Sequence, residues 1–289
     1  MPATETCRQP GSKVDREKAT QIIYGSIGGF RNWSAQIKGR VARVDPDTWA
    51  ERDEELSGSI LFPSAIVTGL LVAAADQIGG WAKMAGSDDN SKATLHVLAD
   101  YSLFRPTIEA LTEVIWILDG DTSKDRVERS IELARIELEH GRLLTKSLRR
   151  AGTPDEQVEK SMAALETQMQ LSLRRLGWDQ KAIVEKMDPS ASTLDPSAIT
   201  RKIGRAFKGS SLELNRYWGI ASAHAHGQLI TTLTFSVRDA PGSDDEGYLH
   251  EPDEILVAEM LLIIQRLVDT ATKLLNRRGY SLHQVFQED

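Results

Sequence analysis

The chain contains very little cysteine: Cys7, in a polar N-terminal segment, is the only one among 289 residues. A single thiol forms neither a disulfide framework nor a cysteine-based metal site within one chain, and this composition is typical of a reducing compartment. Residues 1–13 lack the apolar core of a signal peptide. No stretch offers the roughly 18 uninterrupted apolar residues of a membrane span. We therefore expect a cytoplasmic protein without a membrane partner.

An excess of positive charge is also absent, since 35 lysines and arginines face 42 acidic residues and leave a net charge of −7. Nonspecific binding to nucleic acid needs a concentrated positive surface. Residues 201–216 are a local exception, with Glu213 as their only acid, and residues 208–211 lead into a predicted helix N-terminus that could hold an anion. This stretch indicates RNA or a small phosphorylated ligand as a partner, with a solvated charged face as the alternative. Its basic residues are Arg201, Lys202, Arg205, Lys208 and Arg216.

Clear strand patterns and internal repeats are lacking, whereas apolar residues recur at helical spacing along most of the chain. We predict an all-α fold, a multi-helix bundle of about eight helices. A single domain is expected over residues 14–280, between a disordered tail at residues 1–13 and a C-terminal tail at residues 281–289. The main predicted helices cover residues 14–33, 63–85, 91–118, 124–150, 153–176, 197–208, 212–235 and 253–278, with 63–85 as a central buried helix.

The predicted helix over residues 212–235 places small, polar and titratable residues inside an apolar pattern. In helical projection Asn215, Ser222 and His226 share one stripe about 40° wide, and His224 points about 160° away from His226. We expect the stripe to face the interior, with His226 in a pocket one turn after Ser222. His224 is then a boundary or interface residue. The alternative is a structural His226 held in the core by the serine hydroxyl.

The predicted helix over residues 91–118 carries a proline, Pro106, which removes one backbone donor and is expected to kink it. Arg105, Glu109, Glu113 and Trp116 follow one another at the spacing of a single helical face. Two carboxylates one turn apart repel unless a cation relieves them, and Arg105 is the nearest one. We expect this face to line a pocket, with a purely structural ion pair between Arg105 and Glu109 as the alternative.

Two short motifs resemble those of a large group of helical actinobacterial proteins of unknown function, which are similar to HEPN-type helical bundles. The first is R-P-x-x-E at residues 105–109, followed by residues 114–119, and the second is an S-x-x-x-H-G-like segment within residues 217–227. The resemblance covers roughly residues 60–275. It implies a HEPN-like core in which four residues meet between two core helices: Arg105, Glu109, Ser222 and His226.

HEPN ribonucleases place an arginine a few residues before a histidine, and this chain departs from that spacing. Seven residues separate Arg216 from His224, and nine separate it from His226. The resemblance therefore leaves two functions open. One is a ribonuclease in which His226 accepts or donates a proton and Arg105 or Arg216 steadies the phosphate. The other is a binding or homodimerisation module without that chemistry.

Two further hypotheses use the same region. A small-molecule enzyme would have an apolar pocket walled by Tyr101, Trp116 and Trp218, and a non-enzymatic interaction protein would use the polar residues only to specify packing. No cofactor or metal is predicted, because the E-x-x-H spacing of Glu137 and His140 has no second copy of the kind that di-iron bundles use. The candidate catalytic residues are His226, Glu109, Arg105 and Ser222. The candidate binding residues are Arg216, Asn215, Glu113, Trp116, Tyr101 and His224.

Overall fold

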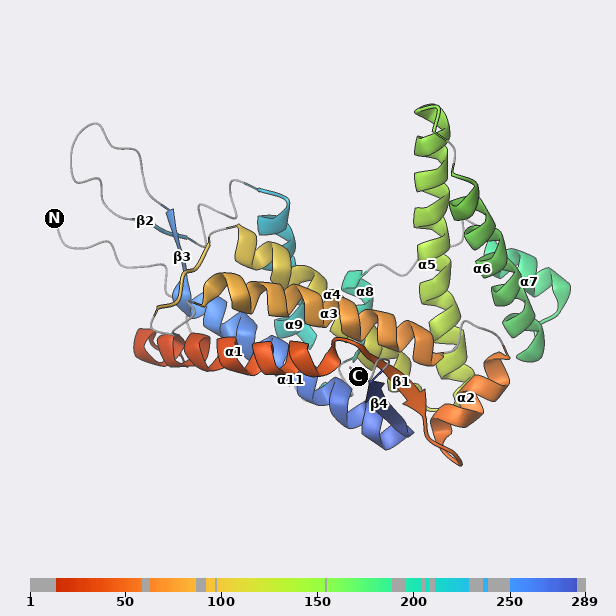
Figure 1. The fold of residues 1–289 in the computed structure, drawn as a ribbon, viewed down its shortest axis with the longest axis horizontal. Helices are drawn as coiled ribbons and strands as arrows, with labels where there is room; N and C mark the ends of the chain where they lie inside the picture. Colours follow the sequence, from red (N-terminus) through yellow and green to blue (C-terminus); the bar gives the residue numbers. More distant parts are fainter. Residues whose placement is uncertain are drawn as a thin grey trace, which may run out of the picture. The chain divides into compact units, whose positions relative to one another are not determined.

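The protein is all-α, as predicted. The structure is a computed structural model that describes residues 14–58, 63–86, 92–96, 98–153, 155–188, 196–203, 206–207, 211–228, 236–238 and 250–284. Over these residues it has ten helices and four short strands. Figure 1 shows the element order along the chain.

The chain divides into two compact units, each assembled from separate stretches of sequence. The first comprises Met1–Lys38, Leu71–Thr112 and Phe207–Asp269, and the second comprises Gly39–Leu70, Glu113–Ala206 and Thr270–Asp289. The prediction of one domain over residues 14–280 stays a prediction. Residues 1–13, predicted as a disordered tail, lie outside the described residues.

The first unit is a set of long helices with one small sheet. It contains α1 (Arg16–Ile37), α9 (Ser211–Ala225), the later part of α3 (Pro63–Ala85), and the first parts of α4 (Ala99–Leu118) and α11 (Glu254–Arg278). The strands β2 (Ser236–Arg238) and β3 (His250–Pro252) pair antiparallel. The predicted start at residue 91 was wrong for α4, which begins at Ala99. The helix then continues through Pro106 to Leu118.

Aromatic side chains form the centre of the first unit. Phe30, Trp81, Tyr101 and Phe104 are all buried, and each ring centroid lies 5.4–6.3 Å from a neighbouring one. Such edge and tilted contacts add to the free energy of apolar burial. The cluster joins α1, α3 and α4, and it therefore fixes the helix that carries Arg105.

Helix α3 is long and apolar enough to span a membrane, a property that the core helices of soluble proteins share. Val67, Leu71, Ile78 and Trp81 are buried along one side of it. Its bounds agree with the central helix predicted over residues 63–85. The structure therefore supports the interpretation of α3 as a core helix.

The second unit combines a helical hairpin with a two-stranded sheet. It contains α2 (Trp49–Ser57), α5 (Ser123–Arg150), α6 (Glu156–Arg175), α7 (Gln180–Met187) and α8 (Pro196–Lys202). Strand β1 (Arg40–Val44) pairs antiparallel with β4 (Tyr280–Gln284). The predicted C-terminal tail from residue 281 was therefore wrong, because residues 281–284 complete a strand whose partner is far away in the sequence.

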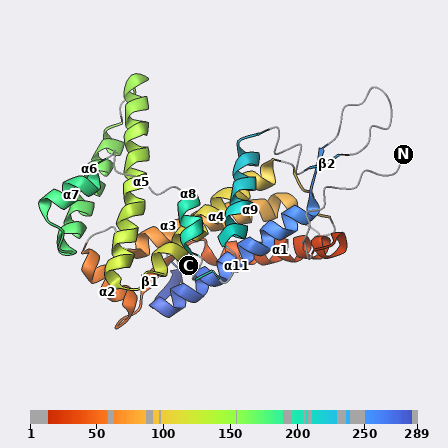
Figure 2. The ribbon, with the colours of Figure 1, turned by 180° about the vertical axis from the view of Figure 1, so that it is seen from behind.

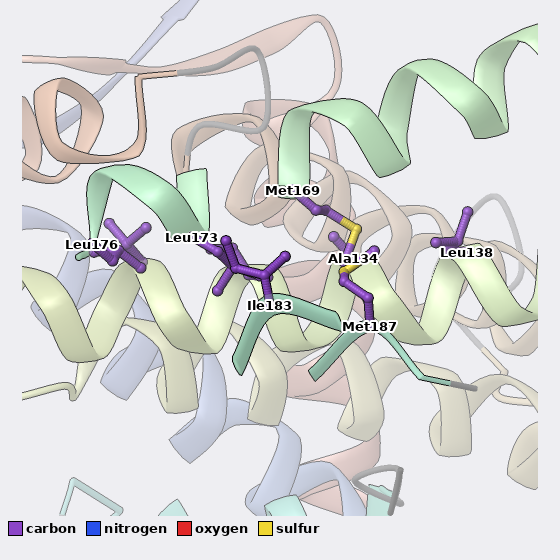
Figure 3. Packing of buried hydrophobic residues seen from close by; sticks show 9 residues of the cluster. Ala134, Leu138, Met169, Leu173, Leu176, Ile183 and Met187 are labelled. Atoms are coloured by element: carbon purple, nitrogen blue, oxygen red, sulfur yellow. The ribbon is translucent and has the colours of Figure 1, made fainter. Parts of the chain in front are cut away.

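The hairpin of α5 and α6 confirms the prediction for residues 124–176, and Figures 1 and 2 show the two helices side by side. Thr122 begins α5 with a capping box, and Asp155 caps α6. Helix α7 adds the side chains of Ile183 and Met187 to the core between them, and Met169 contributes from α6 (Figure 3). Burial of this apolar face holds the three helices together.

A buried ion pair lies between α2 and α5 within the second unit. Both side chains of Asp53 and Arg126 are 0% exposed. The Arg126 guanidinium donates through Nε and Nη2 to the two carboxylate oxygens, at 2.6 and 2.7 Å, and through Nη1 to the Gly120 carbonyl at 2.8 Å. This bidentate geometry is the strongest form of a side-chain ion pair.

Candidate functional site

Helix α9 ends ten residues earlier than predicted, and its end determines where His226 lies. The helix stops at Ala225, and Gly227 adopts a left-handed conformation with φ of 63°. The amide of Gly227 donates to the His224 carbonyl at 2.8 Å, and the amide of Gln228 donates to the Ala223 carbonyl at 3.0 Å. This is the usual way in which glycine terminates a helix. The prediction of one helix over residues 212–235 was therefore wrong.

The inward face of α9 is also the opposite of the predicted one. Leu214, Tyr217, Ala221 and His224 are buried, with His224 1% exposed, whereas His226 is exposed. The larger apolar side chains of α9 determine its orientation, because burying them removes more apolar area from water than burying small residues does. The prediction of an inward-turned His226 was wrong.

His224 is a core residue of the first unit. Its ring stacks on Tyr101 with centroids 4.1 Å apart, and its Nδ1 lies 2.9 Å from the Ile220 carbonyl. Burial lowers the pKa of His224, so its ring is neutral near pH 7, and burial raises the pKa of the Tyr101 hydroxyl. The prediction that His224 lies at a boundary or interface was therefore wrong. Tyr101 is buried as well, so it does not form the wall of an open site.

Arg105, Glu109, His226 and Trp218 form one hydrogen-bond network between α4 and α9. Arg105 Nε donates to Glu109 Oε1 at 2.9 Å, and Arg105 Nη1 lies 2.8 Å from His226 Nε2. The indole N–H of Trp218 donates to the same Glu109 oxygen at 2.9 Å. The structure thus brings together three of the four predicted catalytic residues.

The direction of the bond between arginine and histidine defines the state of the imidazole. A guanidinium has only donors, so Arg105 donates and His226 Nε2 accepts. An accepting Nε2 belongs to the neutral ring with its proton on Nδ1. The Nε2 lone pair of His226 is therefore directed at the Arg105 guanidinium, and solvent also reaches this guanidinium.

The network lies at the protein surface, whereas the sequence predicted an inward-facing pocket between helices that water or a ligand could enter. The side chains of Arg105 and Glu109 are 27% and 21% exposed, and His226 is exposed. A solute can therefore approach the outer side of the guanidinium and the imidazole together. This arrangement suits a polar or charged ligand, because the groups exposed here are a guanidinium, a carboxylate and an imidazole, and they offer little surface to an apolar ligand.

Ser222, the fourth predicted catalytic residue, contributes mainly through its backbone. Its carbonyl accepts a hydrogen bond from the amide of His226 at 3.1 Å. The side chain is half-buried, and its hydroxyl forms no hydrogen bond with another described residue. The predicted hydroxyl contact with the imidazole is therefore not formed.

The predicted binding residues are dispersed. Arg216 is exposed, with its guanidinium 5.5 Å from the ring centroid of Tyr217, and Asn215 is half-buried on α9. Glu113 and Trp116 belong to the second unit, where Trp116 is buried and its ring lies 5.5 Å from the Arg129 guanidinium. Tyr101 and Trp218 belong to the first unit and Trp116 to the second, so the predicted apolar wall of these three residues stays a prediction.

Two other predicted features concern metals and anions. No three histidine, cysteine or acidic residues gather closely enough for a metal ion in the part of the chain that the structure describes. Glu137 and His140 are both exposed, with Oε1 and Nδ1 3.9 Å apart. The predicted anion seat falls on residues 208–210, which lie outside the described residues.

Trp218 was predicted only as a wall of an apolar pocket, and not among the candidate catalytic or binding residues. It lies four residues before Ser222 and eight before His226, on the same side of α9, so helical spacing alone placed it near them. What the spacing did not show was that its indole would donate to Glu109. That bond depends on the distance between α4 and α9, which only the packed structure defines.

No protein family, curated protein or solved structure matches this chain. The function therefore has to be argued from the arrangement of its own residues.

Proposed function

We propose that the chain is a HEPN-like helical protein that binds RNA at the network of Arg105 and His226 and cleaves it without a metal ion. The observation that carries the proposal is the 2.8 Å contact between Arg105 Nη1 and His226 Nε2 at a surface open to solvent. It pairs a cation, which suits a phosphate, with a neutral imidazole, which suits the abstraction of a proton. The cytoplasmic location expected from the composition and a homodimer belong to the same proposal.

Glu109 is a positioning residue in this proposal. Its Oε1 accepts from Arg105 Nε and from the indole of Trp218, so the carboxylate is itself held in place. The guanidinium is thereby fixed at its Nε edge, and its Nη1 lies against His226 Nε2. A pre-oriented arginine loses less conformational entropy when it binds a phosphate oxygen.

The chemistry is an internal transfer at phosphorus. A non-bridging phosphate oxygen accepts the hydrogen bond from Arg105 Nη1 in place of His226 Nε2. The lone pair of Nε2 is then free to accept a proton. Nε2 then accepts the proton of the ribose 2′-hydroxyl while the 2′-oxygen attacks phosphorus. The bond from phosphorus to the 5′-oxygen breaks, and that oxygen takes a proton from water or from the imidazolium. The products are a 2′,3′-cyclic phosphate and a 5′-hydroxyl end.

The test compares two single-stranded RNA oligonucleotides of the same sequence. The second has a 2′-deoxyribose at every position at which the first is cleaved. We expect cleavage of the RNA with EDTA present, a cyclic phosphate on the product, and no cleavage at the deoxy positions. Intact RNA after incubation with the purified wild-type chain would refute the ribonuclease.

Variants separate the roles of the residues. Arg105→Lys retains the charge but loses the planar guanidinium, so we expect RNA binding to weaken and the cleavage rate to fall. Glu109→Gln retains the shape of the acceptor and should lower the rate less. His140→Ala removes an exposed histidine of the second unit, 67% exposed in its side chain, and should leave the rate unchanged. Equal rates for wild type and Arg105→Lys would contradict the assignment of Arg105.

A further outcome distinguishes binding from catalysis. An RNA-binding module without chemistry would bind both oligonucleotides equally and cleave neither, and Arg105→Lys would weaken both. A protein that uses the network only for packing would bind neither oligonucleotide.

A further inference from the structure

A groove of about 600 Å³ lies between α5 and α6 in the second unit, and it shares no residue with the network of Arg105 and His226. Four cationic side chains and two carboxylates line it. Its volume lies in the range of pockets that hold small molecules. The groove lining thus has an excess of two positive charges, whereas the whole chain has a net charge of −7.

The two carboxylates of the groove already have partners. Glu159 Oε1 lies 2.9 Å from both Nε and Nη2 of Arg149, and Glu166 Oε2 lies 3.4 Å from Arg142 Nη2. Within each pair the two charges neutralise each other. Each pair also links an arginine of α5 to a glutamate of α6. The carboxylates therefore act to position the groove walls and add little net negative charge to the space between them.

Lys146 and Arg150 supply the excess charge. Both are exposed, and neither forms an ion pair with another described residue. They lie four residues apart on α5 and so project from the same side of the helix. Two like charges at this spacing repel each other, and an anion bound between them would relieve that repulsion.

The lining also contains less polar residues. Met162 and Ala163 of α6 belong to it, and the Thr145 hydroxyl donates a hydrogen bond to the Gly141 carbonyl at 2.9 Å. A methionine side chain adapts to flat or irregular apolar groups. The groove thus combines cations for phosphate oxygens with a small apolar surface for an attached ring.

We propose that this groove binds a small polyphosphorylated molecule of the size of a nucleoside triphosphate. Arginine and lysine side chains are the usual partners of phosphate oxygens, and the 600 Å³ volume suits such a ligand. A long polyanion fits less well, because the carboxylates of Glu159 and Glu166 lie among the cations of the groove.

The experiment measures binding of four probes to the full chain by isothermal titration calorimetry in magnesium-free buffer. The probes are inorganic tripolyphosphate, adenosine triphosphate, adenosine and a single-stranded RNA oligonucleotide. We expect both polyphosphates to bind, adenosine triphosphate more tightly because its ring can contact Met162 and Ala163, and adenosine alone not to bind.

The variants are Lys146→Ala and Arg150→Ala, with Lys181→Ala as the control. Each of the first two should weaken polyphosphate binding roughly tenfold, because each removes a charge-assisted contact. The control removes an 87% exposed lysine of α7 and should bind as the wild type does. All three positions are exposed, so folding is retained.

Three results would overturn the proposal. The first is no binding of either polyphosphate to the wild type. The second is an equal loss in the control, which would indicate nonspecific charge attraction. The third is RNA binding that depends on Lys146 and Arg150 and exceeds the binding of adenosine triphosphate, which would assign the groove to nucleic acid.

Discussion

The pair of Asp53 and Arg126 is predicted to be the most sensitive point of the second unit. Asp53→Asn retains the size of the side chain and removes its charge. The Arg126 guanidinium then stays buried without a counter-charge, and its acceptors are the one amide oxygen of the new side chain, the Gly120 carbonyl at 2.8 Å and the Ser123 hydroxyl at 3.1 Å. Both partners are 0% exposed, so water does not compensate for the lost carboxylate.

The magnitude follows from the burial. Removing one partner of a buried ion pair costs about 3–5 kcal/mol, because the other charge is left without compensation. That cost lowers the ratio of folded to unfolded molecules roughly 10²–10⁴-fold. At about 2–4 °C for each kcal/mol, the melting temperature should fall by about 6–20 °C.

The assay is urea denaturation followed by far-UV circular dichroism, with hydrogen exchange of the peptides from α2 and α5 to assign the transition to the second unit. Glu55→Gln is the matched control on α2, an exposed acid that should change the free energy of unfolding by no more than about 0.5 kcal/mol. The double variant with Asp53→Leu and Arg126→Met removes both charges and should be close to wild type or more stable. A cost below about 1 kcal/mol for Asp53→Asn would refute the reasoning.

Three further predictions concern single positions. Burial raises the pKa of Asp100 to about 6 from its ordinary value of 3.8, so the folded state holds this proton more tightly and loses stability as pH rises. Between pH 4 and 7 the free energy of unfolding of the wild type, measured by urea titration, should fall by about 2–3 kcal/mol relative to that of Asp100→Asn. Parallel pH profiles of this free energy for the two proteins would contradict the prediction. Gly227→Ala places an alanine in a left-handed conformation, so it should lower the free energy of unfolding by about 1–2 kcal/mol and slow RNA cleavage by displacing His226. Gly152→Ala is the control: Gly152 has φ of 74° and open space around it, so the variant should lose the same free energy of unfolding without slower cleavage. Ser172→Ala removes the buried 2.8 Å hydrogen bond to the Ser57 carbonyl and should lower the free energy of unfolding by about 1 kcal/mol, with no change as the contrary result.

Helix existence could be predicted from the sequence where the apolar pattern was long and regular. The bounds of α3, α5 and α11 agree with the prediction to within one or two residues, because caps and glycines mark their ends. The pairing of β1 with β4 was missed. It joins residues more than 230 positions apart, and neither short strand carries a strong pattern of its own.

The meeting of Arg105 with Glu109 and His226 could be inferred, but the reason given for it was wrong. The inferred contact required His226 to face inward on a continuous helix, whereas Gly227 ends the helix and leaves the imidazole outside. The left-handed conformation of one glycine was the missing information. A glycine directly after a histidine near a helix end is the signal that could have indicated it.

The most direct measurement of the proposed function is the rate constant for cleavage of one RNA oligonucleotide by the wild type and by His226→Ala, in the presence of EDTA. General-base catalysis contributes about 10²–10⁴-fold, so we expect the variant to be slower by that factor while its melting temperature stays within a few degrees of the wild type. Equal rate constants for the two proteins would contradict the role of His226 as the base.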